Sequence, residues 1–169
     1  ATDFDTLDEH KADYKKKLED RAAQTAEMEA DNALYEALIT KMSAEIPEVM
    51  FEHKIDEMVR DFEMRLSQQG LTLDMYLTYT NTDKDAFRKT FADRAANEVK
   101  VRLALEAIAK LENVEISDEK VEEEINKLAE QYKMTADQVK SYVSPEAIKA
   151  DLAVAEAAKI VKDNAKING

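Results

Sequence analysis

The side chains best suited to metal binding or proton transfer are two histidines, His10 and His53, among many carboxylates. Neither histidine has a glutamate three residues upstream, as the Glu-x-x-His ligand pairs of a di-iron bundle require. His53 and Glu57 lie four residues apart and would share one helix face, where they could supply two ligands to a metal. Since two ligands do not make a site, we interpret the pair as a solvated histidine beside a carboxylate.

Three consecutive glutamates, Glu122 to Glu124, form an acidic run that could suggest a metal site or acid–base chemistry. Neighbouring residues of a helix point in different directions, so these carboxylates cannot converge on one atom. The chain has no cysteine for disulfides, zinc sites or thiol chemistry, and its two glycines cannot supply a phosphate-binding loop. We therefore predict no cofactor, no metal site and no catalytic residues.

The scarcity of turn-forming residues predicts the fold class. The 169 residues include 2 glycines and 2 prolines, where average usage would give about twelve and eight. Sheets and barrels need many tight turns, and tight turns use these two residues. The sequence therefore predicts an all-α fold.

The charge and the apolar pattern narrow the range of partners. The formal net charge is −13, and an acidic surface repels the phosphates of nucleic acid. No apolar run approaches the ~20 residues needed to span a bilayer. We predict neither nucleic acid nor a membrane as partner.

Helical periodicity runs along the chain with a few clear interruptions. Ile46-Pro47 ends one apolar stripe, and Gly70 is suited to end the next helix because glycine adopts positive φ at no cost. Thr135, followed three residues later by Gln138, has the spacing of a capping box. The expected helices cover about 7–42, 47–70, 72–79, 83–112, 118–132, 136–143 and 145–161.

Apolar side chains exceed what the short helices can bury. Met75, Tyr76 and Tyr79 lie on a helix of about eight residues, which cannot pack on every side. Methionine adapts to irregular partners, and tyrosine offers a flat apolar face with a polar tip. We regard these three side chains as candidates for binding another polypeptide, with ordinary core packing as the alternative.

Residues 45–77 read EIPEVMFEHKIDEMVRDFEMRLSQQGLTLDMYL, an ordered series that resembles the C-terminal domain of trigger factor, the bacterial ribosome-associated chaperone. The resemblance continues upstream in FDTLDEHKADYKKKLEDRA and downstream in VRLALEAIAKLENVEISDEKVEEEINKLAEQY and AAKIVKDNAKI. It covers essentially the whole chain.

The resemblance implies an elongated helical domain with two helical-hairpin arms. Residues 1–45 would form a long helix of the body, 46–113 the first arm, 114–164 the second arm and 165–169 a tail. Family members also carry a ribosome-docking domain and a peptidyl-prolyl isomerase domain, and neither is found in these residues. Ribosome binding would therefore depend on a domain missing here, and we predict no enzymatic activity. The sequence also begins without methionine, as a fragment or a processed product would.

By the same resemblance, the domain would hold unfolded or nascent polypeptides in the bacterial cytoplasm without ATP. The clients would contact apolar patches between the body and the arms. The rival interpretation is an acidic helical structural or adaptor module that binds one specific protein partner or self-associates. The residues predicted to bind clients are Leu128, Tyr132, Met134, Val139 and Tyr142 on the second arm, with Met75, Tyr76 and Tyr79 on the first.

Overall fold

The structure is a computed structural model and describes residues 7–165. All regular elements in this range are α-helices, which confirms the predicted fold class. No helix in this range is both long enough and apolar enough to cross a bilayer. The helices are α1 (Leu7–Thr40), α2 (Glu48–Gln68), α3 (Leu73–Thr80), α4 (Lys84–Lys89), α5 (Ala92–Leu111), α6 (Asp118–Tyr132), α7 (Ala136–Tyr142) and α8 (Pro145–Asn164).

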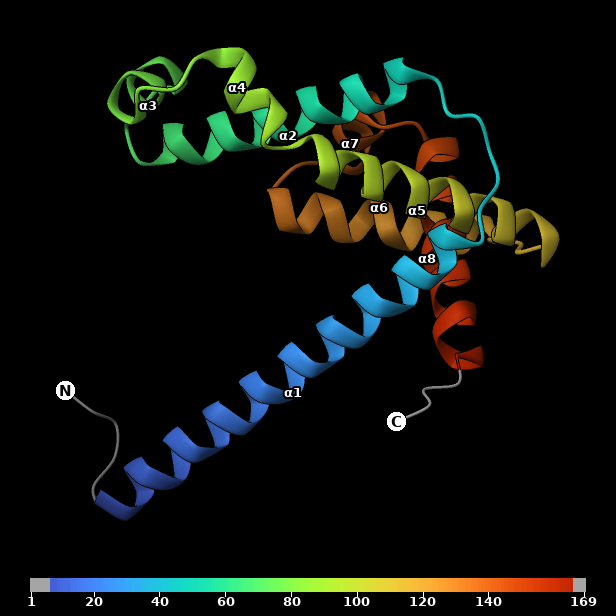
Figure 1. Cartoon of the computed structure of the whole chain (residues 1–169). Helices are drawn as coiled ribbons and strands as arrows, with labels where there is room; N and C mark the ends of the chain where they lie inside the picture. Colours follow the sequence, from blue (N-terminus) through green and yellow to red (C-terminus); the bar gives the residue numbers. More distant parts are fainter. Residues whose placement is uncertain (1–6, 166–169) are drawn as a thin grey trace.

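The domain is elongated and open (Figure 1). We call α2–α4 the first arm and α6–α8 the second arm; α5 runs between them, and most of α1 projects away from both. The chain exposes 13150 Å², whereas a compact protein of the same mass would expose about 8,400 Å². The elongated helical fold with two arms that the sequence predicts is confirmed. The first arm as defined here is shorter than the expected 46–113, which also contains α5.

The first of three apolar cores holds the first arm together. Buried side chains of α2, among them Ile55, Val59 and Leu66, pack with Leu73 of α3 and Phe87 of α4. Partly buried aromatic rings extend this core, with ring centroids of Phe62 and Phe87 5.1 Å apart. The arm is thus packed around aromatic and aliphatic side chains from all three of its helices.

The second core lies inside the second arm, and the third lies where the arms join the body. Ile125 of α6 is fully buried in the second core, together with Val139 of α7 and Ile148 of α8. The third core contains Leu105 of α5 and Ala157 of α8, and the last turns of α1 pack against it. Only the end of α1 is therefore held by other helices.

Several of the helices, among them α6, α7 and α8, begin at side-chain caps of the expected type. Thr135 and Gln138 form the predicted capping box: the Thr135 hydroxyl accepts from the Gln138 N–H at 3.2 Å, and the Gln138 side chain accepts from the Thr135 N–H at 2.8 Å. Ser117 and Ser144 cap α6 and α8 in the same way through their hydroxyls. These caps satisfy backbone N–H groups that have no partner within the helix.

Several helix ends depend on residues with positive φ. Gly70 has a φ of 73°, and the Leu71 N–H donates to the Leu66 carbonyl at 3.0 Å, which completes a Schellman motif after α2. Three other positions of this kind are not glycine, namely Asn81, Asn113 and Lys133. The low glycine content is therefore compatible with the many helix ends, at the cost of some strain.

The predicted helix over 83–112 is wrong in one respect, because the structure divides it into α4 and α5. At the break, the Thr90 hydroxyl donates to the Phe87 carbonyl at 2.6 Å, and the Phe91 N–H bonds three residues back to Arg88 rather than four. This tighter turn lets Phe87 and Phe91 meet edge to face at 5.1 Å in the first core. In addition, α1 ends at Thr40 rather than Met42, and the ends of the chain, 1–6 and 166–169, lie outside the described residues.

Replacing Lys133 with glycine should stabilise the second arm. Lys133 has a φ of 54°, a conformation that costs an L-residue about 1–2 kcal/mol and costs glycine almost nothing. We expect Lys133→Gly to raise the free energy of unfolding by about 1 kcal/mol in urea denaturation. The control is Lys127→Gly inside α6, which should lower stability by about 1 kcal/mol; a loss of stability in Lys133→Gly as well would contradict the argument.

The separation of the cores predicts local rather than uniform loss of stability. Replacing the fully buried Ile125 with alanine should cost about 2–5 kcal/mol within the second arm. Amide hydrogen exchange should then accelerate in α6 and α7 while α2–α4 keep their protection. The exposed Glu123→Ala on the same helix is the matched control, and equal acceleration in both arms would show that the cores unfold as one.

Candidate functional site

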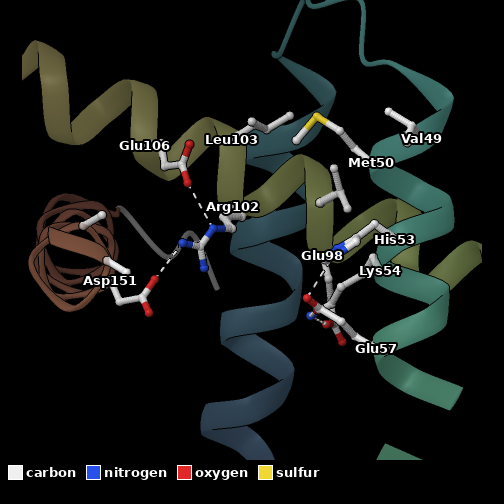
Figure 2. Close-up of a pocket in the computed structure, with 13 residues that line it drawn as sticks. Val49, Met50, His53, Lys54, Glu57, Glu98, Arg102, Leu103, Glu106 and Asp151 are labelled. Atoms are coloured by element: carbon white, nitrogen blue, oxygen red, sulfur yellow. Dashed lines mark hydrogen bonds and ion pairs between the residues drawn. The ribbon is translucent and has the colours of Figure 1, made fainter. Parts of the chain in front are cut away.

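A groove lies between the two arms, with α5 as its floor (Figure 2). We call it the inter-arm groove; it has a volume of about 620 Å³ and opens to solvent. Its walls come from the first half of α2 and the N-terminal half of α8. Apolar and charged side chains alternate along it, the apolar ones being Val49, Met50, Val99, Leu103, Ala147 and Ala150.

Arg102 lies at the centre of the groove and connects α5 to the second arm. Its Nη2 donates to Oδ1 of Asp151 on α8 at 2.6 Å, and its Nε donates to Oε1 of Glu106 at 3.0 Å. Figure 2 shows the guanidinium between these two carboxylates. The hydrogen bond to Asp151 raises the pKa of Arg102, partial burial opposes the shift, and Glu106 adds to it. Arg102 therefore stays positively charged.

Lys54 makes the corresponding connection to the first arm. Its Nζ lies 3.2 Å from Oε2 of Glu98 on α5 and 3.3 Å from Oε2 of Glu57 on α2. Partial burial lowers the pKa of Lys54, but hydrogen bonds and charge attraction from Glu98 and Glu57 outweigh this effect, so the net shift is upward. Ion pairs thus connect each wall of the groove to its floor.

A second groove of about 810 Å³ runs along α5 beside the end of α1. Tyr35 and Ile39 of α1 line it together with Val101 and Leu105 of α5. It shares Lys54, Glu98 and Arg102 with the inter-arm groove. The central ion pairs of α5 therefore separate two adjoining hollows.

The carboxylates singled out in the sequence do not assemble a reactive centre in the structure. His53 Nδ1 lies 3.4 Å from Oε1 of Glu57, the neighbourhood that the sequence suggests. Glu122 binds Lys140, whereas Glu124 binds Lys127, so the glutamate run faces different partners. Within residues 7–165 no three potential ligands approach closely enough to hold a metal ion. The two grooves instead provide apolar side chains for contact, with charged side chains beside them.

The predicted residues on the first arm separate into exposed and packed side chains. Tyr79 is 92% exposed and Met75 is 54% exposed, both on α3 at the tip of the arm. Tyr76 instead packs edge to face on Phe62, with ring centroids 5.0 Å apart. Met75 and Tyr79 are therefore accessible to a partner, whereas Tyr76 supports the helix that carries them.

The predicted residues on the second arm divide in the same way. Tyr132 at the end of α6 is 64% exposed, and Tyr142 at the end of α7 is 79% exposed. Leu128 and Met134 are half-buried against the second core, and Val139 is buried within it. The structure thus leaves two tyrosines free for contact and uses the other three side chains to hold α7 against α6.

Several apolar residues that the structure exposes are not among the client-binding residues predicted from the sequence. Val49 and Met50 line the inter-arm groove, whereas Met64 lies near the end of α2 and Leu71 lies between α2 and α3. For Val49 and Met50 a signal was present, because an apolar run of three residues begins two positions after Pro47, ahead of the stripe that begins at Ile55. Helical side chains lean towards the N-terminus, so those of a first turn have no preceding turn to lie on and are often accessible.

Comparison with known proteins relates this chain to one family by sequence and by fold. Residues 6–163 match the family model described as the C-terminus of bacterial trigger factor protein. The trigger factor of Ruminiclostridium cellulolyticum is 46% identical over 99% of this chain and 40% of its own length. The trigger factor of Bacillus cytotoxicus is 41% identical over 95% of this chain and 38% of its own length.

A solved structure of trigger factor domains from Thermotoga maritima has a similar fold, with a TM-score of 0.54 at 20% identity. The superposition covers 80% of this chain and 81% of that one. The chain spans about 40% of the length of the first relatives it matches. From the family model and these relatives, we conclude that the chain belongs to the family of bacterial trigger factor C-terminal domains.

Proposed function

We propose that this domain holds unfolded or nascent polypeptides without nucleotide, through apolar side chains on both arms and at the inter-arm groove. No catalytic role is proposed for it. The family supports a chaperone role, since the relatives that match nearly the whole chain are trigger factors. Because those relatives are much longer, the proposal concerns only this domain, acting in the cytoplasm.

One observation carries the proposal: large apolar side chains stay exposed on arms that have well-packed cores of their own. They lie on or between α2 and α3 of the first arm and at the ends of α6 and α7 in the second, and two of them, Val49 and Met50, line the inter-arm groove. Apolar surface that stays exposed beyond scattered single residues marks sites of protein interaction. The accessible residues on the arms are Val49, Met50, Met64, Leu71, Met75, Tyr79, Tyr132, Tyr142 and Val143.

The strength of such contacts suits reversible holding. Burial of apolar surface contributes about 25 cal/mol per Å², so a contact of about 300–400 Å² would give at most ~10 kcal/mol. Loss of translational freedom and ordering of the client offset much of this gain. Binding should therefore be weak and fast to exchange, which lets a client leave and fold.

The charge of the domain complements this role. A net charge of −13 makes copies of the domain repel one another while their apolar patches stay open. The carboxylates that border the inter-arm groove would favour client segments with basic residues near apolar ones. The acidic surface thus limits self-association without covering the binding patches.

A structural or adaptor module is the alternative, and breadth of binding distinguishes the two. A structural or adaptor module would bind one specific partner, and that binding would saturate. A holding domain should bind several unrelated unfolded chains with similar affinity.

Replacing both exposed tyrosines of the second arm should weaken client binding with little effect on folding. We expect Tyr132→Ser with Tyr142→Ser to cost on the order of 1–2 kcal/mol of binding free energy. Titration of a permanently unfolded, labelled protein gives the affinity, and urea denaturation gives the stability. If the two rings were core residues, the stability loss would instead be about 3–5 kcal/mol each.

The matched control for this experiment is Leu111→Ser. Leu111 is 78% exposed, much like Tyr142, but it ends α5 on the side away from the arm tips (Figure 1). Its replacement should leave client affinity unchanged. Equal loss of affinity in the control would mean that any exposed apolar residue matters and that the arms are not special.

The domain should slow the aggregation of an unrelated unfolded protein, and ATP should not change the effect. Light scattering of a chemically denatured protein diluted into buffer measures this directly. The physical reason is that apolar contact needs no energy input, only exposed surface. Suppression that depended on ATP, or its absence at an equimolar ratio, would refute the proposed function.

A further inference from the structure

One exposed face of α5 carries charges of alternating sign, one per turn. Arg94, Glu98, Arg102 and Glu106 are spaced four residues apart, so they form a line with steps of about 6 Å along the helix. Within this line, Arg94 Nε lies 2.9 Å from Glu98 Oε1, and Arg102 Nε lies 3.0 Å from Glu106 Oε1. We call these four residues the charge ladder.

Each arm contacts a different member of the ladder. Lys54 of the first arm pairs with the negative Glu98 at 3.2 Å. Asp151 of the second arm pairs with the positive Arg102 at 2.6 Å. The two attachment points are one turn apart on α5, and Figure 2 shows both facing the inter-arm groove.

No apolar core joins the two arms directly, so the distance between them depends on α5 and on these ion pairs. The first and second cores share no residue. Among the described helices, those of the first arm make no extensive packing contact with α6, α7 or α8, whereas α5 packs on both α2 and α8. Apolar packing fixes that each arm is attached to α5, but it tolerates small rotations, because dispersion and burial are not directional. Ion pairs between fixed points restrict such rotation.

We propose that the charge ladder of α5 is an electrostatic clasp that sets how far the two arms stand apart, and that the clasp loosens as ionic strength rises. The width of the inter-arm groove, and hence the size of the segment it admits, follows from the clasp. This inference concerns the free domain and does not depend on the proposed function.

The low free energy of these ion pairs allows the separation of the arms to vary. Exposed ion pairs are worth only about 0.2–1 kcal/mol each, close to thermal energy, so two such pairs bias the arm separation without fixing it. Salt screens them, since the Debye length falls from about 10 Å at 0.1 M to about 3 Å at 1 M. Arg102 and Asp151 are more exposed than Lys54 and Glu98. The second arm should therefore be released first.

The absence of cysteine allows a direct measurement of the arm separation. Spin labels on Gln68→Cys in the first arm and Gln131→Cys in the second would report the distance between the tips by pulsed electron resonance. Both positions are exposed and uncharged, so labelling leaves the charge balance intact. The double-cysteine protein is then compared with Arg102→Met and Asp151→Asn added in turn.

We expect the distance distribution of the parent to broaden between about 0.05 M and 1 M salt. Each added substitution should broaden it already at low salt and abolish the further response to salt, and the two together should add nothing beyond either one. Lys17→Met is the control: it also removes one positive charge, but Lys17 pairs with Asp13 within α1, which projects away from both arms, so the parent's behaviour should persist. Circular dichroism confirms that each variant is folded. A distance distribution that changes neither with salt nor with the two substitutions would overturn the proposal of an electrostatic clasp.

Discussion

Packing along α5 is the constraint on which the rest of the structure depends. The first core includes Ala95 from this helix, and the third includes Leu105 and Ala109. The second core reaches the same region through Val114 and Ala153, which also border the third core. One helix of 20 residues therefore positions both arms and the end of α1. An open shape is possible because each arm has a core of its own and needs α5 only at its base.

The open shape has a functional consequence. A compact domain would bury its apolar residues in one core, whereas here the short helices α3 and α7 cannot bury all of theirs. Tyr79 on α3 and Tyr142 on α7 remain accessible on rigid supports, since Tyr76 and Val139 on the same helices pack inward. Each short helix thus presents one face to its core and another to solvent. Negative charge over the remaining surface offsets the tendency of such patches to associate with one another.

Local signals in the sequence predicted much of the fold, and long-range packing explains what they missed. Capping at Thr135 and the positive φ of Gly70 depend on a few neighbouring residues, so both could be read from the chain. The break between α4 and α5 depends on how Phe87 and Phe91 fit against Phe62, which no local pattern reveals. Site residues follow the same rule: Tyr132 and Val139 are both apolar at helical spacing, yet only the tertiary structure exposes one and buries the other. The inter-arm groove, made by α2, α5 and α8, was likewise beyond local inference.

The central claim is that unfolded chains of different sequence meet the same exposed face of the arms. Methionine methyl groups test it most directly, since Met50, Met64 and Met75 are accessible and Met58 is buried in the first core. The domain, labelled at its methionine methyl groups, would be titrated with two unrelated unfolded proteins and followed by NMR. The account predicts that both clients shift the three exposed methyl signals and leave that of Met58 unchanged. Shifts from one client only, or none at the exposed methyl groups, would contradict it.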